Sequence, residues 1–115
     1  MEKKVEISML CQLYGKLLTE KQCEILEDYY NHDLSLSEIA ENKQITRQAV
    51  RDIIKKGEHK LFEIEEKLQI MKRIMNQEKK IQGILAELSK IQDNSSDKKI
   101  EKILHNVTKE LQCLV

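Results

Sequence analysis

The sequence predicts an all-α fold, a helix-turn-helix bundle whose long recognition helix continues into antiparallel C-terminal helices. Three observations lead to this prediction. The 115 residues include no proline and only three glycines, so few positions would interrupt a helix. Apolar residues recur at steps of three and four through most of the chain, which is the period of one helix face. Side chains that suit helix N-caps stand where one periodic segment gives way to the next.

Two helices are expected first, over residues 5–16 and Glu20–Tyr30. Thr19 precedes the second helix, and its hydroxyl can accept a backbone N–H that has no partner within that helix. The apolar side predicted for the first helix comprises Val5, Met9, Leu10, Leu13, Tyr14 and Leu17. The buried side predicted for the second comprises Cys23, Ile25, Leu26, Tyr29 and Tyr30.

Residues 36–61 predict a helix-turn-helix motif. Ser35 and Glu38 are three residues apart, the spacing of a capping box, and would start a short helix over residues 36–42. Ala40 supplies the small side chain that such a motif needs where its two helices cross. The apolar side chains expected to lock the two helices together are Ile39, Ile45, Val50 and Ile53.

The second helix of the motif is the candidate nucleic-acid-binding element. Residues 43–45 form the turn, in which Gln44 stands where such motifs usually have glycine with a positive φ. The candidate nucleic-acid-binding residues are Thr46, Arg47, Gln48, Arg51, Asp52, Lys55 and Lys56. Thr46 would cap the helix. Arginine can bind guanine O6 and N7 in bidentate fashion, glutamine can do the same for adenine, and aspartate can accept from cytosine.

A heptad pattern predicts that this helix does not end with the motif. Its apolar positions are Val50, Ile54, Gly57, Leu61, Ile64, Leu68, Met71 and Met75. The stripe shifts beyond Lys72, which predicts a kink or short break near Asn76. The seam would serve either as intramolecular core or as a dimer interface. We expect a homodimer, because three long apolar stripes exceed what one thin bundle hides.

The rest of the chain predicts an antiparallel helix pair. Residues 93–96 read as a loop, and Ser96 or Ser95 would cap a last helix that ends near Cys113. The second apolar stripe comprises Ile70, Ile74, Ile81, Ile84, Leu88 and Ile91, and the last comprises Ile100, Ile103, Leu104, Val107, Leu111 and Leu114. We therefore expect two parts, 1–61 with the motif and 62–115 as a helical extension for dimerisation.

Charge and composition exclude several classes of protein. The formal net charge is zero, yet residues 47–80 carry ten basic against six acidic side chains, while residues 1–46 carry five against nine. A basic middle attracts polyanions locally. No run of 18 apolar residues and no signal-peptide pattern exists, so neither a membrane span nor export is expected.

Chemical groups for catalysis are not evident in the sequence. The three cysteines are scattered, as in proteins of the reducing cytosol, and are expected to be small buried residues. The three histidines are isolated, and there is no phosphate-binding glycine loop. We expect a non-enzymatic, cytoplasmic protein without metal or cofactor.

Residues 17–61 resemble region 4 of bacterial sigma factors, whose helix-turn-helix reads promoter DNA. The whole chain resembles the YlxM family of helix-turn-helix proteins, on the segments LYGKLLTEKQ (residues 13–22) and DLSLSEIA (residues 33–40). That family is encoded beside components of the signal recognition particle. The resemblance therefore implies a regulatory or accessory role in the signal recognition particle pathway.

Two functions remain open at this point. In the first, the motif binds duplex DNA, or the structured RNA of the signal recognition particle. In the second, the motif is only a scaffold, and the C-terminal helices bind a protein such as the particle's GTPase. A complete sigma factor is disfavoured, since no segment resembles the other promoter-reading region.

Overall fold

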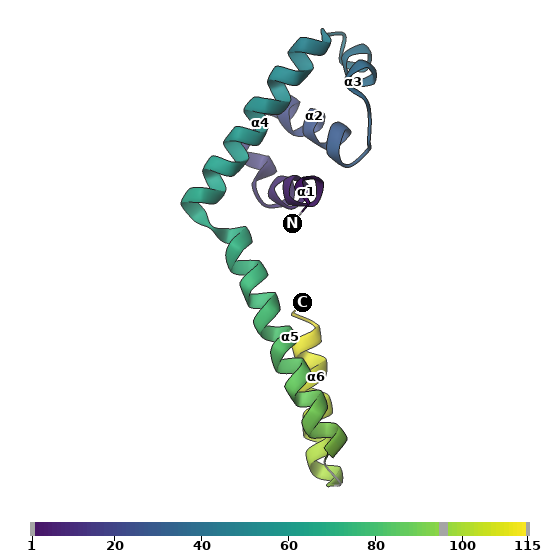
Figure 1. Cartoon of the computed structure of the whole chain (residues 1–115), viewed down its shortest axis with the longest axis vertical. Helices are drawn as coiled ribbons and strands as arrows, with labels where there is room; N and C mark the ends of the chain where they lie inside the picture. The colour runs from purple at the N-terminus through teal and green to yellow at the C-terminus, as the bar shows by residue number, and fades with distance from the viewer. Residues whose placement is uncertain (1, 95–96, 115) are drawn as a thin grey trace. The chain divides into compact units, whose positions relative to one another are not determined.

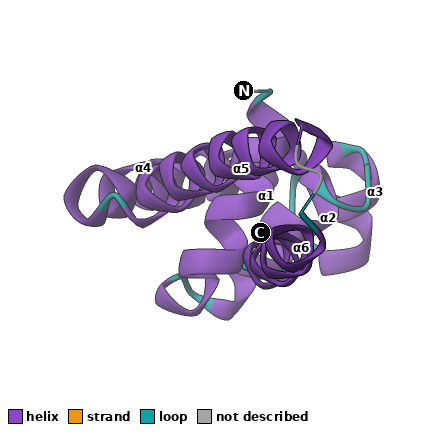
Figure 2. Cartoon of the chain, turned by 90° about the horizontal axis from the view of Figure 1, so that it is seen from below, coloured by secondary structure: helices purple, strands orange, loops and turns teal. Residues whose placement is uncertain are grey.

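The structure is a computed structural model that describes residues 2–94 and 97–114. Every regular element in these residues is helical, and no strand occurs among them (Figure 2). The elements are α1 (Lys3–Tyr14), the 3₁₀ turn η1 (Gly15–Leu17), α2 (Glu20–Tyr30), α3 (Leu36–Lys43), α4 (Arg47–Leu68), α5 (Ile70–Asn94) and α6 (Lys98–Gln112) (Figure 1). The prediction of an all-α fold is confirmed.

Contacts divide the chain into a unit that ends at Met71 and a unit that begins at Lys72. Our expected boundary after residue 61 lies inside the first of these units. The reason is that α4 remains packed on α1 and α2 as far as Leu61, which is fully buried, and is tied to α1 beyond it.

The first unit is built around α4, which contacts α1, α2 and α3. Its fully buried side chains are Ile7, Leu10, Ile25, Leu26, Ile39, Val50 and Leu61. Two of the apolar α2 residues behave as predicted, since Ile25 and Leu26 are both inaccessible. Burying a side chain of this size stabilises a fold by roughly 1.5–3 kcal/mol.

The predicted buried face of α1 is partly wrong. Leu10 and Tyr14 are buried as expected, but Val5 and Leu13 are exposed. The rest of the buried face is formed by Ile7 and Cys11. Both sets recur at the helical period, so the sequence pattern alone could not decide which of them packs against the other helices.

All three predicted N-caps of the first unit are confirmed. The Oγ1 atom of Thr19 accepts from the backbone N–H of Gln22 at 3.1 Å, and Thr46 Oγ1 accepts from Ala49 at 3.0 Å. Ser35 and Glu38 form the full capping box, with each side chain bonded to the backbone N–H of the other residue. Each cap satisfies amides that have no partner within the helix.

The turn of the motif adopts the conformation that the sequence pattern demands. Gln44 has φ 57° and ψ 44°, the left-handed region in which a residue with a Cβ costs about 1 kcal/mol. Ala40, Ile39 and Val50 are buried, and Ile45 and Ile53 are half-buried. The helix-turn-helix is therefore formed by the side chains predicted to lock it.

Gln44→Gly is expected to raise the free energy of unfolding by roughly 0.5–1 kcal/mol, because glycine adopts this backbone conformation without a Cβ clash. Urea unfolding followed by circular dichroism measures the change. Gln44→Ala is the matched control and should be close to neutral, since it keeps the Cβ. A destabilised glycine variant would contradict the assigned turn geometry.

The long helix ends earlier than predicted. We expected a break near Asn76, but α4 ends at Leu68 and Gln69 adopts the left-handed conformation with φ 56°. Contacts remote in sequence hold this break. The Tyr14 hydroxyl donates to Glu65 Oε1 at 2.6 Å and accepts from the Ile70 amide at 3.3 Å.

The same carboxylate also serves the start of α5. The Met71 amide donates to Glu65 Oε1 at 3.0 Å, so two of the first amides of α5 are satisfied at the break. Burial, followed by the hydrogen bond to Glu65, raises the pKa of the Tyr14 phenol above its usual value, so the hydroxyl keeps its donating proton into the alkaline range. The heptad pattern carries no trace of these contacts.

The second unit consists of most of α5 together with α6, and the two helices run antiparallel (Figure 1). The expected loop was too long, since Asp93 and Asn94 belong to α5. The predicted caps Ser95 and Ser96 lie outside the described residues. Asp97 is the N-cap of α6, and its side chain accepts from the Lys99 amide at 2.9 Å.

Candidate nucleic-acid interface

The predicted site residues lie at the N-terminal end of α4 and in the turn before it. Thr46 ends the turn in an extended conformation and turns the chain into the helix. Burial of Val50, Ile54, Gly57 and Leu61 fixes one face of α4 against the rest of the unit. All seven predicted site residues are consequently exposed to solvent.

Three of the predicted cations form one line along α4, which we call the basic strip: Arg47, Arg51 and Lys55. They follow each other at steps of four, so they lie on one side of the helix within about two turns. None of the three has an ion-pair partner in the described part of the chain. The charge of the basic strip is therefore available to an external anion.

Gln48 and Asp52 lie beside the basic strip and are bonded to each other. Gln48 Nε2 donates to Asp52 Oδ1 at 3.1 Å. This bond orients the amide, but it also occupies one donor that would otherwise be free for a base. A base that binds Gln48 must therefore share or replace this contact.

A hollow of about 200 Å³ adjoins the basic strip and was missed by sequence reasoning. It is lined by Tyr29, Leu36, Arg51, Ile54 and Lys55, from α2, α3 and α4. The predicted buried face of α2 includes Tyr29, yet this residue is 36% exposed. Its ring meets Tyr30 edge-on at 5.0 Å. The helical spacing of the two tyrosines gave no signal of this difference.

Two other positions, Lys56 and the N-terminus of α2, are less well placed for a contact with nucleic acid. Lys56 is exposed, but it lies about 140° around α4 from Arg51 at 3.6 residues per turn. A helix N-terminus can bind phosphate, but that of α2 is already capped by Thr19 and Gln22. Glu20 follows that cap and would repel an anion.

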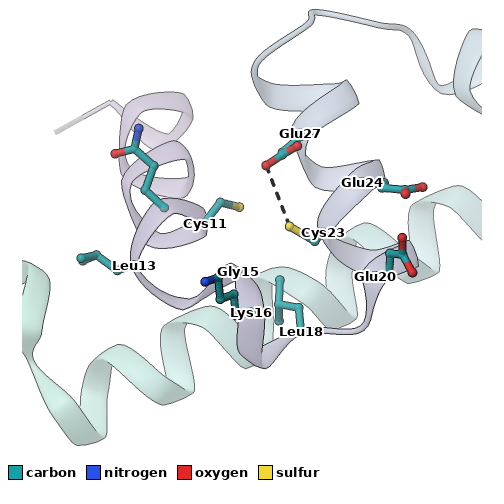
Figure 3. A pocket seen from close by; sticks show the side chains of 10 residues that line it. Cys11, Leu13, Gly15, Lys16, Leu18, Glu20, Cys23, Glu24 and Glu27 are labelled. Carbon is teal, nitrogen blue, oxygen red and sulfur yellow. Dashed lines mark hydrogen bonds between the residues drawn. The ribbon is translucent and has the colours of Figure 1, made fainter.

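A larger hollow, of about 750 Å³, lies between α1 and α2 and has an acidic edge (Figure 3). It is lined by Cys11, Gln12, Leu13, Gly15, Lys16, Leu18, Glu20, Cys23, Glu24 and Glu27. Cys23 Sγ donates to Glu27 Oε1 at 3.9 Å, and Glu24 is paired with Lys43 at 2.7 Å. Its carboxylates make it unsuitable for nucleic acid.

The cysteines differ from the expectation that all three are buried. Cys11 is buried, Cys23 is half-buried and Cys113 is exposed. Burial, followed by the neighbouring Cys23 and Glu27, raises the pKa of Cys11 from 9.0 to about 11. A thiol with such a pKa is almost wholly protonated at neutral pH and is a poor nucleophile.

Alkylation with iodoacetamide at pH 8 should therefore modify Cys113 first and Cys11 last. We expect Cys11 to react at least ~100-fold more slowly, because its thiolate fraction is small and its sulfur is buried. Raising the pH from 9 to 11 should speed its reaction and also lower stability, since the unfolded chain loses this proton first. Peptide mass spectrometry measures the order, and early labelling of Cys11 would contradict it.

The chain matches the family model described as "Putative helix-turn-helix protein, YlxM / p13 like" over residues 1–111. The chain belongs to this family. The match spans every element of the first unit and nearly all of α6, so the family covers both units. The resemblance noted from the two N-terminal segments is confirmed.

The chain is similar to proteins of Clostridium and Acetivibrio species. A "UPF0122 protein" of Clostridium botulinum is 49% identical over 88 residues, 76% of this chain and 81% of the relative. "UPF0122 protein CPE1714" of Clostridium perfringens is 40% identical over 96% of this chain and 97% of its own length. One from Acetivibrio thermocellus is 39% identical over 100% of this chain and 98% of its length.

None of the helices within 2–94 and 97–114 combines the length and the apolar character needed to cross a bilayer. No cluster of His, Cys, Asp or Glu in these ranges is arranged to bind a metal ion.

Proposed function

We propose that this chain is a non-enzymatic, nucleic-acid-binding regulator or accessory factor that uses the N-terminal end of α4. One observation supports this most strongly: the basic strip is exposed, lies on the second helix of a helix-turn-helix and has no compensating acid partner in the described residues. Such helices enter the major groove by their N-terminal residues.

The site residues fall into several roles in this proposal. Arg47 and Arg51 would contact base edges or phosphates, and Lys55 a phosphate. Gln48 would read a base after exchanging its bond to Asp52. Thr46 would position the helix through its cap and Lys56 would add a peripheral phosphate contact. Nothing in this scheme requires a metal or cofactor.

We further propose that the factor acts as a cytoplasmic homodimer in the signal recognition particle pathway. Support for the pathway comes from the family resemblance alone. Support for a dimer comes from the apolar side chains that the single chain leaves exposed on α5 and α6. Groove-reading proteins commonly dimerise, because two half-sites multiply affinity and specificity.

A filter-binding panel tests this function. The probes are a mixed-sequence DNA duplex, the signal recognition particle RNA and an unrelated RNA hairpin of equal length, each over a salt series. We expect the logarithm of the association constant to fall linearly with the logarithm of the salt concentration, because binding releases counterions. The tightest probe then distinguishes a DNA target from an RNA target. Absence of binding to all three at low salt would reject the proposal.

A protein–protein adaptor is the second candidate function. It is favoured by the apolar faces of α5 and α6, which would suit the GTPase of the particle as a partner. Pull-down of the purified GTPase with and without nuclease separates the two functions. A complex that survives nuclease favours the adaptor, and one that disappears favours binding through nucleic acid.

A further inference from the structure

The helices of the second unit carry more apolar surface than their mutual contact covers. Ile81 of α5 is 6% exposed, and Leu104 and Leu111 of α6 are half-buried, so these side chains mark the faces by which the two helices meet. Six other large aliphatic side chains in this unit are 38–66% exposed: Ile84, Ile91, Ile100, Ile103, Val107 and Leu114. We call this second set the outer apolar face.

Helix geometry places the five helical members of the outer apolar face on one side of the hairpin, and the sixth, Leu114, follows the end of α6. At 3.6 residues per turn, Ile84 lies about 60° and Ile91 about 80° around the axis of α5 from Ile81. Both are displaced in the same direction around the helix. The three members in α6, Ile100, Ile103 and Val107, lie about 40–100° from Leu104 in the same sense, each helix being viewed from its own N-terminus. The two helices run antiparallel (Figure 1). Side chains displaced in the same direction on each helix, viewed from its own N-terminus, therefore lie on the same side of the hairpin.

A single two-helix hairpin is an incomplete structure. Apolar arcs wider than about 100° on a helix are typical of helices that have two apolar neighbours, as in a four-helix bundle. Monomeric proteins rarely expose contiguous apolar patches larger than a few hundred Å². Another pair of helices with the same kind of face would complete the bundle.

The distribution of charge favours a second copy as that partner. The first half of α5, residues 70–82, carries four basic side chains against one acidic, whereas residues 83–94 carry one against two. In a face-to-face pair of hairpins related by a two-fold axis, each helix faces an antiparallel neighbour. The basic first half of α5 in one copy then does not face the same basic half in the other copy. It faces either the acidic second half of the other copy's α5 or the neutral C-terminal end of the other copy's α6.

We infer that two copies of this chain associate through the outer apolar face and form an antiparallel four-helix bundle from α5 and α6. This inference rests on the proposed homodimer but not on nucleic-acid binding. It also moves the interface away from the heptad seam that the sequence suggested, since Val50, Ile54 and Leu61 of that seam are buried within one chain.

Sedimentation velocity over a concentration series tests the interface. The wild type should sediment as a dimer with twice the chain mass of 13.6 kDa. The double variant Ile84→Glu/Ile103→Glu should weaken dimerisation by about 100-fold or more. It replaces four apolar side chains per dimer, two in each copy, with charged ones. Leu17→Glu is the matched control: Leu17 is 55% exposed but lies in the first unit, so that variant should remain dimeric.

Each outcome has a definite meaning. A monomeric double variant with a dimeric control supports the inference. If the glutamate double variant and Leu17→Glu are both dimeric, this interface is wrong but the proposed homodimer stands. If the wild type is monomeric, both the interface and the homodimer are wrong. Should circular dichroism show lost helix in the glutamate variant, Ile84→Gln/Ile103→Gln replaces it and must also dissociate. A wild type that is monomeric alone but binds the GTPase through Ile84 and Ile103 would favour the adaptor instead.

Discussion

Arg47→Ala/Arg51→Ala is expected to weaken nucleic-acid binding by about 100-fold at moderate salt, since a well-formed arginine contact contributes about 1–3 kcal/mol. Both side chains are exposed and unpaired within the described chain, so the fold should be unaffected. The salt dependence should also become shallower, because fewer counterions are released. Filter binding over a salt series measures both effects.

Lys98→Ala/Lys99→Ala is the matched control for that experiment. It removes the same charge from exposed positions at the start of α6. If binding depends on the basic strip, the control should bind nearly as the wild type does. Equal losses in the two variants would mean that net charge governs binding, and unchanged binding by the arginine variant would remove the assignment of α4 as the reading helix.

Gly57→Val is expected to lower the free energy of unfolding by about 3 kcal/mol, the upper end of what overpacking a core costs. A Cβ added at Gly57 would lie 2.8 Å from Cδ1 of Leu26, which is fully buried and cannot swing into solvent. This glycine is therefore required by the close approach of α2 and α4, although glycine weakens a helix by about 1 kcal/mol relative to alanine.

Gly83→Ala is the control at a glycine that has no close neighbour, and it should change stability in the opposite direction. No atom lies within 4 Å of the Cβ that would be added there, and the residue is exposed in the middle of α5. Alanine should raise the stability of the helix by up to about 1 kcal/mol. Urea unfolding followed by circular dichroism compares Gly57→Val with Gly83→Ala, and an unchanged or stabilised Gly57→Val variant would contradict the packing of α2 on α4.

Local chemistry explains which parts of the fold were predictable. The caps at Thr19, Ser35 and Thr46 depend on side chains within three residues of the helix start, so the sequence contains the whole signal. The left-handed turn at Gln44 is likewise set by the spacing of the two motif helices. The predicted site residues lie outside the α4 stripe that buries Val50 and Ile54, so the helical period already predicts their exposure.

Features that depend on remote contacts were not predictable. The break at Gln69 is held by the Tyr14 hydroxyl and the Glu65 carboxylate, which are 51 residues apart. The buried face of α1 was a choice between two stripes of equal period, decided by its packing on α2 and α4. The exposure of Tyr29 beside the basic strip depends in the same way on how three helices meet.

Amide chemical shifts measured during a titration with a mixed-sequence DNA duplex, and separately with the particle RNA, test the central claim most directly. At low salt even non-specific binding engages the phosphate-contacting surface, so the exact target is not needed. We predict that the largest shift changes fall on residues 46–56 and on Tyr29, and that they reverse when salt is raised. Changes confined to α5 and α6, or none at all, would contradict the claim that α4 reads nucleic acid.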